Sequence, residues 1–460
     1  MTTIDCISPI DGSLVASREA LSPQAADAAA GRARAAQPAW AARPLDERVT
    51  LVKRAIDILG QQTDRMAEEL ARQMGRPIRY GGEYGPAKER TDYMAAIAAD
   101  ALAPMVAEAS DTFERRIVHE PLGVILVIAP WNYPYITSIN TIVPGLIAGN
   151  TVVLKHASQT LLVGEHLAEC FHAAGVPEDV FQNVVLDHPT TERLIAAGAF
   201  DHVNFTGSTA GGRAIERAAG GTFTSIATEL GGKDPGYVRQ DADVDAAVET
   251  LMDGAMYNSG QCCCGIERIY VHESLFDAFV EKSVALVKGY RLGNPLDSET
   301  TIGPMAHKRF ARIVREQIAD AVENGAIAHV PVMEADDGGA YLSPQVLTNV
   351  NHDMTVMREE SFGPVVGIMP VKDDEEAIRL MNDSTYGLTA SVWTSDVDAA
   401  NAIGARIETG TVYMNRCDYL DPALCWTGCK NTGRGAGLSV LGYHALTRPK
   451  SYHLRKKVSA

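Results

Sequence analysis

The sequence predicts an α/β protein with more than one domain. Its 460 residues exceed the roughly 100–200 residues of one typical domain. Apolar residues make up 46% and charged residues 22%, as in ordinary globular proteins. Short β-branched runs alternate with helical stretches over most of the chain. This alternation predicts parallel sheets covered by helices on both faces, which bind ligands outside the carboxyl ends of their strands.

The amino-terminal part of the chain is predicted to be mostly helical. Residues 1–20 are rich in turn formers and read as extended chain, whereas residues 22–93 are rich in Ala, Leu, Arg and Glu with apolar residues at helical spacing. Pro and Gly at 42–44 and 75–77 separate the helical segments. Several helices are therefore expected before the first sheet.

A first series of strands begins at residue 113. Residues 113–123 alternate between apolar and polar side chains and indicate a pair of strands. The helices that follow are expected at 138–148, 161–174, 190–197 and 212–219, and the strands of the sheet at 124–130, 151–155, 180–185, 202–208 and 225–230.

A second series begins after Gly232 and predicts a second α/β domain. A helix is expected at 244–256, and strands at 268–272, 365–369, 389–394 and 410–415. Near the end of the chain, residues 448–455 alternate but have no obvious partner. They can pair either with residues 113–120 or with another chain.

The charge excludes several classes of partner. The formal net charge is −17, which repels nucleic acid and anionic membranes. The chain does not open with a secretory signal, and no run reaches the roughly 18 apolar residues of a spanning helix. We expect a cytoplasmic protein that binds neither nucleic acid nor membranes, with its eight cysteines as free thiols.

Residues 258–268 read NSGQCCCGIER and place three cysteines side by side. Adjacent side chains project in different directions, so the run is a poor metal cage and no metal is expected. Two interpretations remain from the run itself. The thiols are a buried packing cluster, or one of them is a nucleophile supported by neighbouring catalytic groups.

Four other motifs carry candidate groups. TELGGK places Glu229 at a strand end, which suits a general base. APWNYP places Asn132 after the first core strand, where an amide can donate to an oxyanion. FTGST at 205–209 opens a helix, whose first turn suits a phosphate. REESFGP at 358–364 joins two acids to a turn. Each motif is a weak signal when taken alone.

Taken together and in this order, PWN, FTGS, ELGGK, GQCC and EESFGP resemble the aldehyde dehydrogenase superfamily, in its NAD(P)-dependent, non-acylating form. The resemblance runs from about Pro9 to Lys450. It implies a Rossmann-type cofactor domain, an α/β catalytic domain and a small β oligomerisation extension. The implied bounds are 1–110 with 122–233 for the cofactor domain, 234–436 for the catalytic domain, and 111–121 with 447–457 for the extension.

The resemblance also implies catalytic roles. The family pattern G-Q-x-C selects Cys263 as the nucleophile that attacks an aldehyde. Asn132 and the Cys263 backbone N–H then hold the oxyanion, and Glu229 activates the water that hydrolyses the thioester. The implied reaction is NAD(P)⁺-dependent oxidation of an aldehyde to its carboxylic acid, through a Cys263 thiohemiacetal and thioester.

Cofactor contacts follow from the same motifs. Where NAD-preferring members usually carry Glu, this chain has Ser158, which does not repel a 2′-phosphate, while Lys155 attracts one. We expect NADP to be accepted, with NAD preference as the alternative. The expected cofactor contacts are Ile128, Pro130, Trp131, Lys155, Ser158, Phe205, Ser208, Glu360 and Phe362.

The substrate pocket is less well determined. Two expected pocket residues, Tyr133 and Trp426, predict an aromatic collar for an apolar aldehyde. The alternative is a carboxylated aldehyde of the succinate-semialdehyde type, for which Arg416 is a candidate contact unless it faces solvent in an ion pair. The resemblance implies a homodimer or homotetramer. The expected pocket residues are Tyr133, Asn140, Cys262, Cys264 and Trp426.

Three alternatives stay open. Acylating relatives pass the thioester to coenzyme A, but they generally lack a base like Glu229. A non-catalytic binding protein on the same fold would have lost Cys263 or Glu229, and both are present. The neighbouring thiols, with those at 425 and 429, are also candidates for a redox trap of Cys263.

Overall fold

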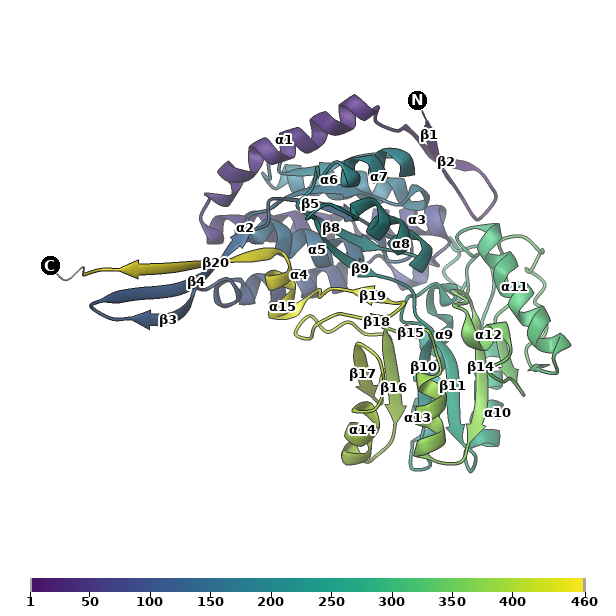
Figure 1. Ribbon diagram of the computed structural model, residues 1–460. Helices are drawn as coiled ribbons and strands as arrows, with labels where there is room; N and C mark the ends of the chain where they lie inside the picture. The colour runs from purple at the N-terminus through teal and green to yellow at the C-terminus, as the bar shows by residue number, and fades with distance from the viewer. Residues whose placement is uncertain (1, 458–460) are drawn as a thin grey trace.

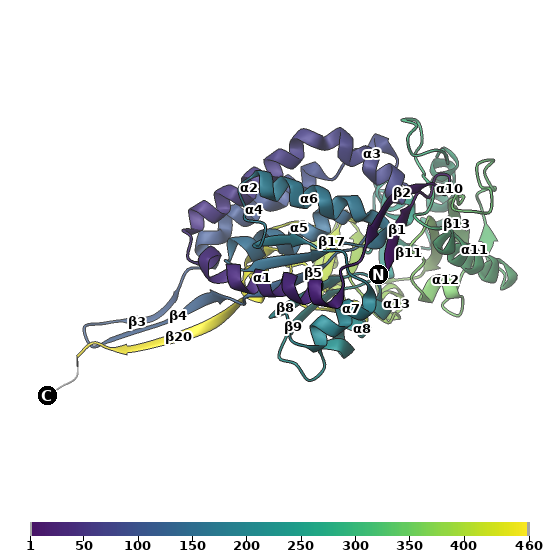
Figure 2. The same ribbon diagram turned by 90° about the horizontal axis from the view of Figure 1, so that it is seen from above.

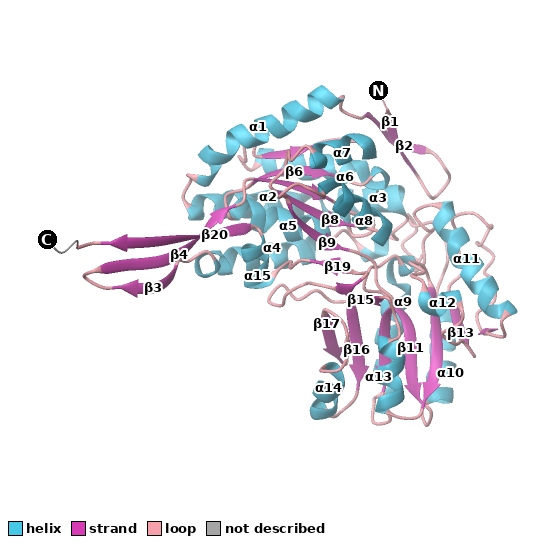
Figure 3. Cartoon of the chain, in the orientation of Figure 1, coloured by secondary structure: helices cyan, strands magenta, loops and turns pink. Residues whose placement is uncertain are grey.

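The computed structural model describes residues 2–457. Its main body consists of two mostly parallel sheets covered by helices, and a long β-ribbon leaves this body (Figure 1). Figure 3 shows helices on both sides of each large sheet. Among the described residues, no helix has the length and apolar character needed to span a bilayer.

The first large sheet has six strands in the order β19-β9-β8-β5-β6-β7. All neighbours are parallel except β19 and β9. Its strands are β5 (Val124–Ile128), β6 (Thr151–Lys155), β7 (Phe181–Asn183), β8 (His202–Thr206), β9 (Ser225–Glu229) and β19 (Gly433–Arg434).

Strand β5 shows why helices cover both faces of this sheet. Ile125 and Val127 point into one apolar cluster, whereas Val124, Leu126 and Ile128 point into another. This period-2 alternation of wholly apolar side chains requires both faces to be buried. Helices α5 (Pro134–Ile147) and α6 (Leu161–Ala173) contribute to the first cluster, and α7 (His188–Ala196) and α8 (Thr209–Ala219) to the second.

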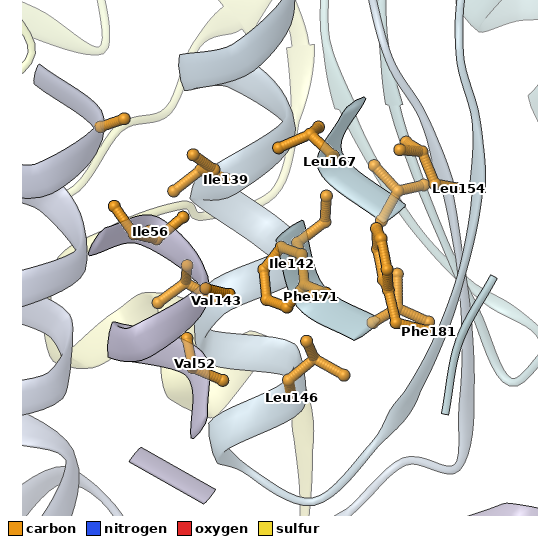
Figure 4. Close-up of a cluster of buried hydrophobic side chains, with 14 of the residues drawn as sticks. Val52, Ile56, Ile139, Ile142, Val143, Leu146, Leu154, Leu167, Phe171 and Phe181 are labelled. Atoms are coloured by element: carbon orange, nitrogen blue, oxygen red, sulfur yellow. The ribbon is translucent and has the colours of Figure 1, made fainter. Parts of the chain in front are cut away.

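Figure 4 shows how the first cluster is filled. Side chains of α5, such as Ile139 and Leu146, lie in one cluster with the side chains of α2 (Leu45–Leu59) and with two aromatic rings, one from α6 and one from β7. Phe171 and Phe181 have ring centroids 4.6 Å apart. Such interdigitation of fully buried side chains fixes α5, and therefore the loop that precedes it, at the end of β5.

Most of the amino-terminal helices pack on the same side of this sheet. They follow a hairpin of β1 (Thr3–Ile7) and β2 (Leu14–Glu19), which the sequence predicted only as extended chain. The helices are α1 (Pro23–Ala41), α2 (Leu45–Leu59), α3 (Thr63–Met74) and α4 (Tyr84–Ala101). Of these, α1 alone lies across the opposite face, where its alanines join the second cluster.

The second large sheet has seven strands in the order β12-β13-β14-β11-β10-β16-β17. It is parallel except for the short β12. Its strands are β10 (Asp234–Val238), β11 (Ile266–His272), β12 (Ile327–Ala328), β13 (Gln345–Thr348), β14 (Val365–Val371), β16 (Thr389–Trp393) and β17 (Thr411–Met414).

Helices surround this sheet as well. Helices α9 and α10 share one apolar cluster, and α13 lines another on strands β10, β11 and β16. The helices of this part are α9 (Val244–Met256), α10 (Phe276–Lys288), α11 (Lys308–Glu323), α12 (Thr355–Arg358), α13 (Asp374–Asn382) and α14 (Val397–Gly404); the two-stranded pair β15 (Tyr386–Gly387) and β18 (Cys429–Lys430) lies beside it.

The ribbon consists of β3 (Met105–Ala109), β4 (Phe113–Pro121) and β20 (Thr447–Arg455), all antiparallel, and β20 follows helix α15 (Ser439–Ala445). Its two long strands pair over nine residues, from Thr447 with Pro121 to Arg455 with Phe113. Both views show it projecting away from the main body (Figures 1 and 2). The carboxyl-terminal strand thus pairs with its own chain, and one edge of β20 has no partner strand within residues 2–457.

The predicted α/β class is confirmed, but some local predictions were wrong. Residues 113–121 form one continuous strand in place of a strand pair within residues 113–123, because the partners of β4 come from β3 and β20. The helix expected from residue 138 begins at Pro134, since proline is well tolerated in the first turn of a helix.

Candidate active site

Two cavities meet where the carboxyl ends of the first sheet's strands face the second sheet. The larger has a volume of about 820 Å³ and the smaller about 270 Å³. Both are lined by Cys263, Glu229, Thr206 and Leu230. The candidate nucleophile and the candidate base therefore lie at the junction, where a molecule in either cavity can reach them.

The larger cavity is the candidate cofactor site. The aromatic ring of Trp131 forms part of its wall and is stacked with Phe310 at 5.2 Å and edge-on to Phe362 at 5.4 Å between centroids. The wall includes all nine residues expected from the sequence to contact the cofactor: Ile128, Pro130, Trp131, Lys155, Ser158, Phe205, Ser208, Glu360 and Phe362.

Two glycines of the ELGGK turn allow its backbone to lie very close to Glu360 and to the cysteine loop. A Cβ on Gly231 would lie 2.2 Å from a carboxylate oxygen of Glu360, and one on Gly232 would lie 2.6 Å from the Cys263 carbonyl oxygen. The backbone N–H of Gly232 donates to Glu360 Oε1 at 3.1 Å. Only glycine permits this approach of the ELGGK turn to the acid and to the cysteine loop.

A buried ion pair fixes the loop that carries Glu360. Lys233 Nζ pairs with Glu267 and donates to Ser361 Oγ at 3.0 Å. Glu267 in turn accepts the backbone N–H groups of Ser361 and Phe362, each at 2.8 Å. Burial raises the pKa of Glu360 to about 8.

This cavity fits a nicotinamide dinucleotide. It is long enough to run from the carboxyl ends of β6 and β8 to Cys263, and it offers the Lys155 ammonium together with the N-terminus of α8 for phosphate. Apolar and aromatic walls suit the flat rings. Thr2 and the first three residues of β1, Thr3 to Asp5, also line it, a contribution that the sequence did not indicate.

The smaller cavity is the candidate substrate site. Four of the five residues predicted to line it do so, namely Tyr133, Cys262, Cys264 and Trp426. The fifth, Asn140, is buried behind the wall, where its Oδ1 accepts a hydrogen bond from Arg90 Nη1 at 3.0 Å. Arg416 does not line either cavity; it is exposed and lies over the Tyr419 ring.

The three adjacent thiols form a compact group in which each sulfur lies within 4.8 Å of the others. The neighbouring thiols of Cys262 and Cys264 lower the pKa of Cys263 to about 6. The pKa of Cys262 rises to about 12, and that of Cys264 also rises. The middle thiol is therefore the most acidic of the three.

Asp418 completes this group and was missed by the sequence reasoning. Its Oδ1 lies 3.1 Å from Cys262 Sγ and 3.0 Å from Cys264 Sγ. Burial raises the pKa of Asp418 well above its usual value. Both thiols donate to this oxygen, so Asp418 fixes the two sulfur atoms that flank Cys263.

The other two thiols expected near the nucleophile lie elsewhere. Neither Cys425 nor Cys429 is among the described residues that line the two cavities. Cys429 Sγ donates to the Glu408 carbonyl oxygen at 3.0 Å. A redox partner for Cys263 would thus come from Cys262 or Cys264.

Glu229 is placed by strand β9 and held by a neighbouring strand. Thr206 Oγ1, at the end of β8, donates to Glu229 Oε2 at 3.2 Å. Burial raises the pKa of Glu229 to about 7, and the effects of Thr206 and Arg90 only partly oppose this rise. A carboxyl group that titrates near neutrality is suited to general base catalysis.

Asn132 follows β5 and is fixed by a buried network. Arg76 forms an ion pair with Glu83 at 2.7 Å and donates both to Asn258 Oδ1 and to the Asn132 carbonyl oxygen. Asn132 Nδ2 donates to the Gln261 carbonyl oxygen at 3.2 Å, in the loop that leads to the cysteines. The network ties the candidate oxyanion donor to the candidate nucleophile.

Sequence signals for the missed residues differ in strength. Thr206 stands inside FTGST and could have been proposed from its place at a strand end. Arg90 and Asp418 belong to no motif. Arg90 lies on a helix and Asp418 in a loop, and both are far from the cysteines in sequence. Only the folded chain shows that they face the same cavity.

Known proteins resemble this chain over its whole length. The model of the aldehyde dehydrogenase family matches residues 1–452. A succinate-semialdehyde dehydrogenase [NADP(+)] of Deinococcus radiodurans is 34% identical over 420 residues, which cover 91% of this chain and 88% of that protein.

Solved structures agree. The structure of Gox0499, reported for cofactor and substrate selection, superposes with a TM-score of 0.93 at 32% identity, covering 99% of this chain and all of that one. PnpE in complex with nicotinamide adenine dinucleotide superposes with a TM-score of 0.94 at 30% identity, covering all of this chain and 95% of that one. The chain therefore belongs to the aldehyde dehydrogenase family, as its ordered motifs predicted, and is an aldehyde dehydrogenase.

Proposed function

We propose that this enzyme oxidises an aldehyde to its free carboxylic acid by covalent catalysis at Cys263, with Glu229 as the general base and Asn132 as an oxyanion donor. The observation that carries the proposal is the position of Cys263 and Glu229 at the junction of the two cavities. A substrate in the smaller cavity and a cofactor in the larger one meet there.

The first step uses the low pKa of Cys263. As a thiolate it attacks the aldehyde carbon and forms a thiohemiacetal. One amide hydrogen of Asn132 is bonded to the Gln261 carbonyl oxygen, so the second is free to donate to the oxygen that becomes negative. A bound nicotinamide would supply the acceptor for the hydride that leaves the thiohemiacetal carbon, and the thioester to Cys263 would remain.

The second step uses Glu229. As a carboxylate it takes a proton from water, which attacks the thioester carbon and releases the acid and the Cys263 thiolate. Its presence favours hydrolysis over transfer to coenzyme A. With a pKa of about 7, the group takes up and releases protons readily at neutral pH.

NADP is proposed as an accepted cofactor, with NAD as the alternative. Ser158 lies in the cavity wall near Lys155, and this combination leaves room and positive charge for a 2′-phosphate. The relative from Deinococcus radiodurans carries NADP(+) in its name. Residues 1–110 with 122–233 form the proposed cofactor domain, and residues 234–436 the catalytic domain.

A homodimer or homotetramer in the cytoplasm is proposed, with residues 111–121 and 447–457 as the contact. The support is the unpaired edge of β20 on a ribbon that leaves the main body (Figure 2). An edge strand of this length pairs readily with a second copy. Light scattering on the purified protein tests this, and a monomer at micromolar concentration would contradict it.

Trapping the thioester tests the proposed chemistry. Glu229→Gln should release one equivalent of reduced cofactor in a burst and then stall, with the acyl mass retained on the peptide that holds Cys263. The control Glu192→Gln, an exposed acid on α7, should turn over continuously. A stalled enzyme without a burst, or an acyl group on another residue, would contradict the assignment.

A further inference from the structure

Arg90 is a buried cation that faces the smaller cavity without an anionic partner. It lies on α4, is 4% exposed, and lines the cavity together with Thr137 and Glu229. Within the described residues it forms no ion pair within 4.0 Å. A buried guanidinium is costly unless its charge is balanced and its N–H groups are bonded.

The hydrogen bonds of Arg90 leave part of the guanidinium free. Nη1 donates to the Ile136 carbonyl oxygen at 3.3 Å and to Asn140 Oδ1 at 3.0 Å. Nε and Nη2 have no acceptor among the described residues, and neither is enclosed by protein atoms. The free edge of the group therefore faces the cavity.

No nearby acid acts as the anionic partner of Arg90. Glu83 is committed to Arg76 and to the backbone N–H groups of Tyr135 and Ile136. Glu229 bonds to Thr206, and burial raises its pKa to about 7.

The remaining acids of the cavity form no ion pair with Arg90. Asp418 bonds to the flanking thiols, and burial raises its pKa well above its usual value. Glu89 and Asp253 are exposed, and Glu89 accepts a hydrogen bond from the Tyr419 hydroxyl. Arg90 is thus the one cationic side chain among the described residues that line this cavity.

We propose that Arg90 is a specificity-determining residue that binds an anionic group at the far end of the substrate, so that the enzyme prefers short aldehydes carrying a carboxylate. The free edge of the guanidinium offers two parallel donors, which match the two oxygens of a carboxylate. Asn140 holds Arg90 from behind through its Oδ1 and fixes the direction of these donors. The inference rests on the proposed function, because it assumes that the smaller cavity holds the aldehyde.

The test compares a charged aldehyde with a neutral one that is larger by one methyl group, 4-oxobutanoate and its methyl ester. The wild type should favour the acid in kcat/KM by about 10–100-fold, the range expected for hydrogen bonds to a charged group. Arg90→Met should abolish this preference, mainly through KM, and Arg90→Lys should restore part of it. Arg416→Met, which alters an exposed arginine outside the cavity, should keep the preference.

The ratio of the two substrates within each variant removes effects on folding and on Glu229. If Arg90→Met lowered kcat/KM equally for both substrates, the inference would be overturned, because Arg90 would then act through Glu229 or the fold. Oxidation of the ester as fast as the acid by the wild type would also overturn it and leave the proposed function intact. If the wild type oxidised neither of these two substrates and no unbranched alkyl aldehyde, the proposed function itself would be contradicted.

A second measurement needs no variant. Butanoate should inhibit the wild type more strongly than butanamide, which has the same length but no charge, competitively with the aldehyde, by about tenfold or more. Equal inhibition by the two compounds would count against the anion-binding role of Arg90.

Discussion

The sulfur atoms of Cys262 and Cys264 lie 3.6 Å apart, next to that of Cys263. This arrangement gives the outer thiols a role beyond packing. They lower the pKa of the middle thiol, and both donate to Asp418, which holds them in place. A hydrogen bond to the ionised form of an acid stabilises that form and lowers its pKa.

Removing the outer thiols should therefore raise the pKa of Cys263. Cys262→Ala and Cys264→Ala are each expected to shift its titration upward from about 6, by at least about one pH unit. The pH dependence of iodoacetamide alkylation, with labelling at Cys263 verified by mass spectrometry, measures this directly. Cys429→Ala is the control and should leave the profile unchanged. An unchanged profile in the first two variants would show that the outer thiols only pack.

Turnover should rise with pH through neutrality. Glu229 acts as a base only when deprotonated, and burial raises its pKa to about 7. Since Cys263 is already deprotonated above about pH 6, loss of the Glu229 proton limits the rate of thioester hydrolysis. We expect kcat to fall about tenfold for each pH unit below the midpoint. A steady-state profile from pH 5.5 to 9 checks this; a flat kcat over that range would contradict it.

Glu229 should also make the protein less stable as pH rises. Its pKa is about 7 when folded and near 4.5 when unfolded, so the unfolded chain releases the proton first and stability is lost between these values. In Glu229→Gln the side chain does not ionise, so this loss of stability does not occur. The variant should match the wild type near pH 4.5 and exceed it at pH 8 by about 1–3 kcal/mol, since water in the cavities reduces the full effect. Urea unfolding of both proteins at both pH values measures this difference in stability. No difference at pH 8, or a less stable variant, would refute the prediction.

The residue at position 158 should govern the choice of cofactor. In Ser158→Glu, a new carboxylate in the cavity wall repels a 2′-phosphate and accepts hydrogen bonds from ribose hydroxyls. The ratio of kcat/KM for NADP over NAD is expected to fall by at least about tenfold. Ser158→Gln, which adds size without charge, is the matched control. An equal fall in both variants would assign the effect to size alone.

Much of the fold could be predicted because its strands are apolar and regularly spaced. Residues 244–256 were expected as a helix and form α9 over that range. The missed strand β10 shows the limit of such reasoning. Its sequence DPGYV contains Pro235 and Gly236, which disfavour a central strand. The neighbouring strands override this preference, with an irregular register between Asp234 and Pro235.

The candidate site was predictable only where residues belong to motifs. Cys263, Glu229 and Asn132 stand in short patterns whose order along the chain is informative. The structure places Cys263 and Glu229 at the junction of the two cavities and Asn132 in the wall of the larger one. Arg90 and Asp418 have no such pattern. Their significance depends on burial and on the absence or presence of partners, which are properties of the packed structure.

The identity of the nucleophile is the central claim, and one experiment tests it most directly. Formation of reduced nicotinamide would be followed by absorbance for the wild type, Cys263→Ala and Cys262→Ala, with a panel of alkyl, aromatic and carboxylated aldehydes and both cofactors. We predict that turnover is lost in Cys263→Ala and kept, with an altered pH profile, in Cys262→Ala. Turnover that survives in Cys263→Ala, or that is lost only in Cys262→Ala, would contradict the account.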